Sequence, residues 1–182
     1  MSNPEQSDTI FLKSLGKVSD TTVFNFLEAE LNKIFKIPVQ IDSPIPVDPS
    51  AYNEKRDQYY SPIILKQLSK KERHEIILGV VEVDLYVEGL NFIFGQADIR
   101  NRKAIISLAR LRQEYYGRKP NQNLFQKRTL TEAVHELGHV YGLSHCLNPQ
   151  CVMFFSNSLR DTDVKGYEFC KTCRKKMSIP DR

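Results

Sequence analysis

The chain has 182 residues, of which 41% are hydrophobic and 10% aromatic, enough to fill the core of one domain. Its 26 basic and 22 acidic residues give a formal charge of +4, too mild to favour nucleic acid or an anionic membrane as the main partner. No stretch reaches the roughly 18 consecutive apolar residues of a membrane span, and the polar start MSNPEQSDTI lacks the features of a signal peptide, so we expect a cytoplasmic protein.

Two helices and one strand are expected in the first 71 residues. In TTVFNFLEAELNKIFK, at 21–36, apolar residues recur at helical spacing, and the preceding Asp20 is a suitable N-cap. The run PVQID at 38–42 is typical of a strand, and three prolines between 43 and 58 predict a loop. A short helix is expected at 62–71.

Three β-rich runs follow, at 76–87, 91–98 and 103–111. The first alternates between apolar and polar residues in its second half. A turn containing Gly89 separates it from the second, and the polar RNR precedes the third. The next segment, 112–123, is polar and contains glycine and proline, which predicts a loop.

A second long helix is expected at 124–142. One of its stripes is apolar (Leu130, Val134, Leu137 and Tyr141), and another is more polar (Arg128, Thr131, His135 and His139). The chain then becomes irregular and ends in a short basic helix around 168–177. This order predicts an α/β (α+β) fold, a twisted mixed sheet with two main helices, and a division into 1–142 and a small Cys-rich subdomain at 143–182.

The segment HELGHVYGLSHC, at 135–146, contains three of the four histidines in the chain. His135 and His139 are four residues apart, so on a helix their imidazoles share one face and can bind one cation. Glu136 lies about 100° around the helix from His135. There it can reach a water on the metal, which makes it the candidate general base.

A third ligand is available after the helix. Gly142 can end the helix with a positive φ, and His145 follows closely enough to return to the metal. Three neutral imidazoles leave one position open for water, which is typical of a catalytic zinc site rather than a structural one. Such a site also accepts Co²⁺, Ni²⁺ or Cu²⁺.

The alternative is a coincidental match. The pattern H-E-x-x-H arises by accident in helices, and His74 and Glu75 show how easily half of it appears. The longer pattern H-E-x-x-H-x-x-G-x-x-H, from His135 to His145, fixes five residues and is far more specific. We therefore expect a metal site.

All four cysteines lie near the end of the chain, in the pattern C-x4-C followed by C-x2-C: Cys146, Cys151, Cys170 and Cys173. These spacings predict a closed four-thiolate zinc site that fixes the tail. Two disulfides or reactive thiols are the alternatives, although clustered cysteines in a reducing compartment more often bind metal. The basic run at 174–176 leaves a zinc ribbon that contacts nucleic acid as a further alternative, but three charges are more typical of a solvated helix end.

Cys146 directly follows His145, so a ligand of one predicted site adjoins a ligand of the other. A structural ion would then hold the loop that carries the third catalytic ligand.

These residues resemble the metzincins, and among them the archaemetzincins. HELGHVYGLSH matches the metzincin motif, and Met153 in CVMFF is similar to the methionine of the Met-turn. The pattern C-x4-C-x-M with a later C-x2-C resembles the archaemetzincin branch, as do VDLYVEGLNFIFGQA, AIISLARL and FSNSLRDTDVK. The resemblance covers most of residues 80–173, whereas the first 75 residues match only in the order of elements.

The resemblance implies a metzincin-like zincin fold and peptide-bond hydrolysis through a zinc-bound water, with Glu136 as general base and proton shuttle. It implies two zinc ions, a catalytic one on His135, His139 and His145 and a structural one on Cys146, Cys151, Cys170 and Cys173. Met153 would form an apolar floor beneath the catalytic site. The family binds substrate antiparallel along an edge strand, for which 91–98 is the candidate; a plain, covered edge strand is the alternative.

Two rival functions use the same ligands: a latent or non-proteolytic zinc-binding module, against which Glu136 argues, and a hydrolase of a non-peptide amide. The expected partner is a peptide or protein substrate, with no nucleic acid, no membrane and a monomeric state. Tyr115, Tyr141 and Tyr167 are available as oxyanion donors, but the sequence assigns none of them.

Overall fold

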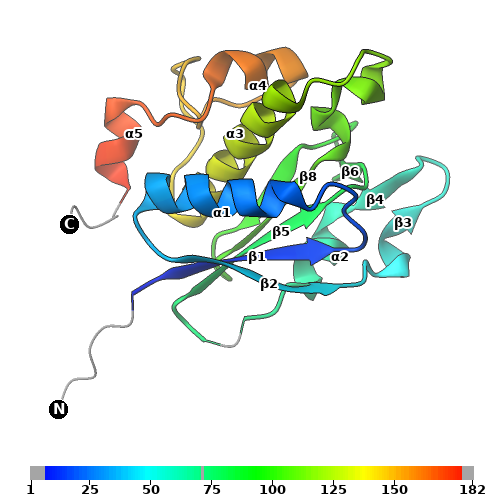
Figure 1. The fold of residues 1–182 in the computed structure, drawn as a ribbon, viewed down its shortest axis with the longest axis horizontal. Helices are drawn as coiled ribbons and strands as arrows, with labels where there is room; N and C mark the ends of the chain where they lie inside the picture. Colours follow the sequence, from blue (N-terminus) through cyan, green and yellow to red (C-terminus); the bar gives the residue numbers. More distant parts are fainter. Residues whose placement is uncertain (1–6, 71, 178–182) are drawn as a thin grey trace.

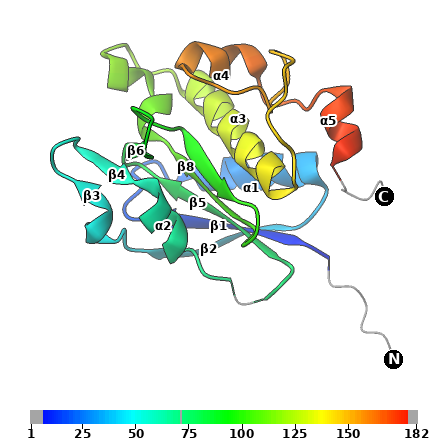
Figure 2. The same ribbon diagram turned by 180° about the vertical axis from the view of Figure 1, so that it is seen from behind.

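The computed structural model describes residues 7–70 and 72–177. Its centre is a five-stranded sheet with the order β2-β1-β5-β8-β7 (Figures 1 and 2). The parallel strands are β1 (Thr9–Leu15), β2 (Val39–Ile45), β5 (Glu75–Val81) and β8 (Lys103–Ser107), and β7 (Gly95–Asp98) pairs antiparallel with β8 at one edge. A smaller sheet contains β3 (Tyr52–Asn53), β4 (Gln58–Tyr60) and β6 (Leu85–Tyr86). The predicted mixed sheet is confirmed.

Two long helices cover one face of the large sheet, and a short helix packs on the other (Figures 1 and 2). The long helices are α1 (Thr22–Phe35) and α3 (Gln122–Val140), and the short one is α2 (Ser61–Gln67). Two further helices follow α3, namely α4 (Leu159–Lys165), which packs against it, and α5 (Lys171–Lys176). Single 3₁₀ turns occur at Pro49–Ala51, Ala109–Leu111 and Gln113–Tyr116.

The central strand β5 shows why both faces must be covered. Ile76, Leu78 and Val80 belong to the core under α1 and α3. Ile77 and Val81 alternate with them and pack with Ile64 of α2. A parallel strand buried on both faces is apolar almost throughout, which β5 is.

The strand β1 was not predicted from the sequence. It pairs in parallel with both β2 and β5, and Ile10 and Leu12 are fully buried. The segment directly follows the polar start of the chain, and its strand conformation depends on two partners that lie far along the sequence. Local periodicity therefore gave too weak a signal.

The predicted loop at 43–58 was wrong in part, because it contains the end of β2, a 3₁₀ turn and β3. Long-range contacts order this region. The guanidinium of Arg56 donates to the carbonyls of Leu90 (3.1 Å) and Asn91 (2.8 Å), and the Gln58 amide also donates to Asn91 O (2.9 Å). Such contacts cannot be read from local composition.

Several other boundaries differ from the predictions. The run at 76–87 divides into β5 and β6, the run at 91–98 is a strand only from Gly95, and the run at 103–111 ends as a strand at Ser107. α2 ends at Gln67, earlier than the predicted helix at 62–71, whose last residue lies outside the described residues. The predicted basic helix is the shorter α5, and α4 was not predicted.

The two long predicted helices are confirmed within two residues at each end. The first residue outside α1 is Thr21 rather than Asp20, which shifts the expected N-cap by one position. The Asp20 carboxylate nevertheless accepts a hydrogen bond from the Thr22 N–H (3.1 Å), so it still satisfies a backbone donor of the first turn.

The C-terminal segment shares the main core. Val152 and Met153 are fully buried, and the Phe169 ring meets Phe35 of α1 edge to face, with centroids 6.2 Å apart. The division into two subdomains at residue 142 stays a prediction. The ends of these subdomains at 1–6 and 178–182 lie outside the described residues. Among the described helices, none is both long and apolar enough to span a membrane.

We expect Ile76→Ala to lower the free energy of unfolding by about 2–5 kcal/mol, because it leaves a cavity under α1 and α3. Ile41→Ala on β2 is the matched control, since that side chain is 45% exposed, and it should cost about 1 kcal/mol or less. Urea unfolding followed by circular dichroism measures both. Equal losses would contradict the assignment of β5 to the core.

Candidate metal centre

The end of α3 sets the direction of the chain at the site. Gly142 has a φ of 83°, its N–H donates to His139 O (2.8 Å), and the Leu143 N–H donates to Gly138 O (3.0 Å). These bonds form a left-handed helix C-cap, which a residue with a Cβ adopts only with strain. The predicted reversal at Gly142 is present, and it brings His145 back towards α3.

The three histidines converge on one point. One ring nitrogen from each of His135, His139 and His145 lies within 4.8 Å of the others. The Nε2 atoms of His135 and His139 are 3.2 Å apart. Two nitrogens bound to a tetrahedral zinc at about 2.0–2.1 Å would be separated by roughly 3.3–3.4 Å, so the spacing fits zinc.

Backbone carbonyls fix the orientation of two of these rings. His135 Nδ1 lies 2.6 Å from Val152 O, and His139 Nδ1 lies 2.7 Å from Leu143 O. A carbonyl only accepts, so each Nδ1 carries the proton and donates. The Nε2 lone pairs are thereby left for a metal, which is the usual arrangement around metal-binding histidines.

Burial keeps the imidazoles neutral. It lowers the pKa of His135 well below the ordinary value, with a further contribution from the nearby Lys165. Burial also lowers the pKa of His139 and, in a more exposed position, that of His145. Neutral imidazole is the form that binds a metal ion, so the three rings are suited to coordination near neutral pH.

Glu136 is buried beside the edge strand. Burial, reinforced by Glu132, raises the pKa of its carboxyl to about 8. A Cβ on Gly95 would lie 2.8 Å from Glu136 Oε1 and 2.7 Å from Ile105 O. The missing side chain of Gly95 therefore lets β7 approach α3 where Glu136 lies, a requirement that the sequence alone did not reveal.

Met153 lies directly under α3. Its sulfur occupies the space that a Cβ on Gly138 would need, so a glycine is required there. The Met153 carbonyl accepts a hydrogen bond from the Cys146 N–H (2.9 Å). The residue predicted to form the floor of the site thus also holds the segment that contains His145.

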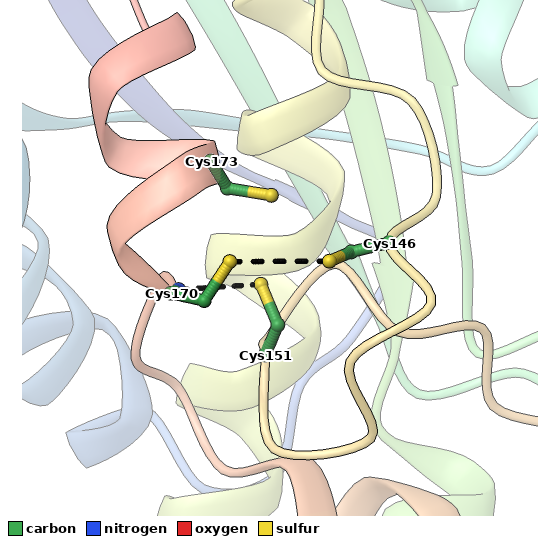
Figure 3. Close-up of side chains that lie close together, drawn as sticks. All are labelled: Cys146, Cys151, Cys170 and Cys173. Carbon is green, nitrogen blue, oxygen red and sulfur yellow. Dashed lines mark hydrogen bonds between the residues drawn. The ribbon is translucent and has the colours of Figure 1, made fainter.

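The four cysteines converge on a second point, with their side chains directed towards one another (Figure 3). All four Sγ atoms lie within 4.8 Å of one another, and those of Cys146 and Cys170 are 3.9 Å apart. Tetrahedral zinc with Zn–S bonds of about 2.3 Å requires roughly 3.8 Å between sulfurs, so the cluster fits zinc. All four thiols are free in this structure, so each sulfur is available as a ligand.

The electrostatics of the cluster favour a thiolate at Cys170. The backbone N–H of Cys173 is the main cause that lowers the pKa of Cys170 to about 7, and the Cys170 N–H in turn donates to Cys151 Sγ (3.3 Å). Thiolates bind zinc, so a thiol that ionises readily suits a ligand.

A cavity of about 170 Å³ opens beside His135 and Glu136. Its walls are formed by the segment 90–95, by Glu132, His135 and Glu136 of α3, and by 155–157 with Lys165. β7 borders it and is the edge of the sheet. Tyr115, Tyr141 and Tyr167 are not among the residues that line it, and Tyr141 instead stacks on Phe35 in the core.

Ion pairs join α4 to α3, and one of them lies in the cavity lining. Arg128 forms two hydrogen bonds of 2.7 Å with the Asp163 carboxylate, and Lys165 Nζ lies 3.2 Å from Glu132 Oε1. Thr162 Oγ1 also donates to Glu132 Oε1 (2.9 Å). Neither pair is predicted from the sequence. The sequence offers one indication that Glu132 belongs to the site, which is its position one helical turn before Glu136.

A comparison with known protein families shows to which family the chain belongs. The model of peptidase family M54 matches residues 28–179. The chain belongs to this family, the archaemetzincins. It is 46% identical over 171 residues to the archaemetzincin of Methanocaldococcus jannaschii, with 92% of each chain covered, and 44% identical to that of Pyrococcus furiosus, with 93% of this chain and 92% of the relative covered.

Solved archaemetzincin structures agree with the fold. The Archaeoglobus fulgidus protein, complexed with malonate, superposes with a TM-score of 0.81 at 38% identity, over 92% of this chain and 99% of that one. The Methanopyrus kandleri protein gives a TM-score of 0.83 at 31% identity, over 97% of both chains. The predicted family and fold are confirmed, and the protein is a zinc metallopeptidase whose substrates are peptides.

We expect Gly95→Ala to reduce kcat/KM for peptide cleavage by about tenfold or more, because the new methyl group must displace Glu136 or the backbone of β8. Zinc content measured by mass spectrometry should stay close to that of the wild type, since the three histidines are not touched. Full activity in this variant would contradict the close approach of β7 to Glu136.

Proposed function

We propose that the chain cleaves peptide bonds at the cavity beside His135 and Glu136. The observation that carries this proposal is the convergence of three imidazole nitrogens next to a buried glutamate and the edge strand of the sheet. Three protein ligands, a base and a strand to bind the substrate are the parts that a zinc peptidase needs.

His135, His139 and His145 would hold the catalytic zinc. When bound, the ion supplies Lewis acidity, which polarises the scissile carbonyl and makes water more acidic. The Nδ1 hydrogen bonds of His135 and His139 hold their rings in the orientation for binding. This rigidity matters because catalytic geometry must be maintained within about half an ångström.

Glu136 acts as the general base in this proposal. In its ionised form, the Glu136 carboxylate takes a proton from the attacking water and passes it to the leaving amine. This role requires ionisation of a carboxyl whose pKa burial raises to about 8. The position of Glu136 against Gly95 places the carboxylate beside the strand that would hold the substrate. A substrate that pairs with β7 in antiparallel fashion extends the sheet by one strand and brings its backbone past Glu136.

The four cysteines would hold a second, structural zinc. Their sulfur spacing supports this proposal, and four thiolates leave no open coordination position. Two zinc ions are therefore proposed for each chain. A monomeric state, a cytoplasmic location and the absence of a nucleic-acid partner remain predictions from the sequence.

Glu136→Ala tests the proposed base. We expect zinc-loaded wild-type protein to cleave members of a mixed peptide library, and the variant with equal zinc content to lose about 10²–10⁴-fold in kcat. Glu88→Ala is the control, because Glu88 is exposed and lies outside the cavity lining. Equal cleavage by Glu136→Ala and wild type, with both fully loaded, would eliminate Glu136 as the base.

Cys170→Ser tests the coupling of the two sites. The Cys146 N–H bond to Met153 O joins the cysteine loop to the residue under α3, so loosening the cysteine cluster should loosen His145. We expect the variant to bind less than half as much metal at the histidine site as wild type, measured with Co²⁺ absorption, in which thiolate and imidazole sites differ. Full occupancy of the histidine site would show that the sites are independent.

A further inference from the structure

The cavity beside Glu136 has a polar end built from buried charged groups. Glu132 is 2% exposed and Lys165 is 3% exposed, yet both line the cavity. Buried charges are costly unless they are paired, and these two form an ion pair at 3.2 Å. The rest of the lining includes the aromatic residues Phe92, Phe94 and Phe155. A side chain that enters therefore meets apolar walls and a polar end.

The ammonium of Lys165 has more N–H donors than hydrogen-bond acceptors around it. Its ammonium carries three N–H groups, and within the described part of the chain it finds acceptors in Glu132 Oε1 (3.2 Å) and Phe154 O (3.4 Å). Its third close neighbour is His135 Nδ1, at 3.3 Å. That nitrogen already donates to Val152 O, so it cannot accept from Lys165. One N–H at the polar end thus lacks an acceptor.

Ser156 supplies a second unsatisfied group in the same cavity. Its Oγ is shielded from solvent and has no hydrogen-bond partner among the described residues. Buried polar atoms are rarely left unpaired in proteins, so an unpaired atom in a binding cavity points to a ligand group. A carboxamide has an oxygen that can accept from Lys165 and an NH₂ that can donate to Ser156. A carboxylate could accept from both groups as well, but it would bring a second negative charge beside Glu132, whose charge Lys165 already neutralises.

The direction of the edge strand identifies which substrate residue enters. A peptide antiparallel to β7 runs past Asp98 first and Gly95 afterwards, because β7 itself runs from Gly95 to Asp98. The scissile bond lies near Glu136, which contacts Gly95. Beyond that point the peptide reaches the segment 90–94, which lines the cavity. The cavity therefore receives the side chain directly after the scissile bond.

We propose that Lys165, positioned by its ion pair with Glu132, selects peptides with glutamine or asparagine directly after the scissile bond. This inference rests on the proposed peptide hydrolysis at Glu136 and specifies the substrate of that site. Lys165 is thereby a specificity-determining residue. It forms no bond that is made or broken in the reaction.

The competing explanation is that Glu132 and Lys165 only attach α4 to α3. The double variant Glu132→Gln with Lys165→Met separates the two explanations. It removes both charges together, so that no buried charge is left alone, and it leaves the Arg128–Asp163 pair that also holds α4. Lys127→Met is the matched control, since Lys127 is an exposed lysine on α3.

The experiment compares two peptides that differ only after the scissile bond, with glutamine in one and the similarly shaped methionine in the other. We expect wild-type and Lys127→Met protein to favour the glutamine peptide about tenfold or more in kcat/KM, because a hydrogen bond to a charged group is gained. In the double variant, this preference should fall to about twofold or less. A purely structural pair would lower both rates and leave their ratio unchanged.

Binding to the Glu136→Ala variant provides a second readout without turnover. We expect the glutamine peptide to bind about tenfold more tightly than the methionine peptide, measured by fluorescence anisotropy. Equal or weaker binding, or cleavage that favours methionine, would overturn the assignment of Lys165. If wild-type protein cleaves neither peptide, the proposed function fails and the binding ratio alone decides the selectivity. If the double variant does not fold, the cleavage ratio of wild-type protein and the binding ratio of Glu136→Ala still test the proposed selectivity.

Discussion

The hydrogen bond from His135 Nδ1 to the carbonyl of Val152 joins α3 to the segment on which the site depends. It fixes the tautomer of His135 and leaves Nε2 available for metal. Val152 lies between Cys151, a member of the thiol cluster, and Met153, which packs under Gly138. Displacement of this short segment would therefore disturb the imidazoles, the thiols and the floor of the site together.

The contacts of this segment also explain why Cys146 directly follows His145 in the sequence. The Cys146 N–H is held by Met153 O, and its thiol belongs to the cluster that includes Cys151. His145 is the most exposed of the three histidines. A closed thiolate site beside it would replace the packing that an exposed loop cannot provide.

Features that depend on local pattern could be predicted from the sequence. The two long helices, the reversal at Gly142 and the two groups of possible ligands all follow from spacing over a few residues. Strand β1 and the closeness of Gly95 to Glu136 could not be predicted, because both are consequences of long-range pairing in the sheet. The ion pair of Glu132 with Lys165 crosses from α3 to α4, and no local pattern indicates it.

We propose that one chain holds two zinc ions, bound by imidazole Nε2 atoms and by thiolates. The most direct test is a crystal structure of the zinc-loaded protein with anomalous diffraction recorded on both sides of the zinc absorption edge. We expect two zinc peaks, one among Nε2 of His135, His139 and His145 and one among the four cysteine sulfurs. A single peak, or a histidine site bound through Nδ1 of His135 instead of Nε2, would contradict the proposal of two zinc ions.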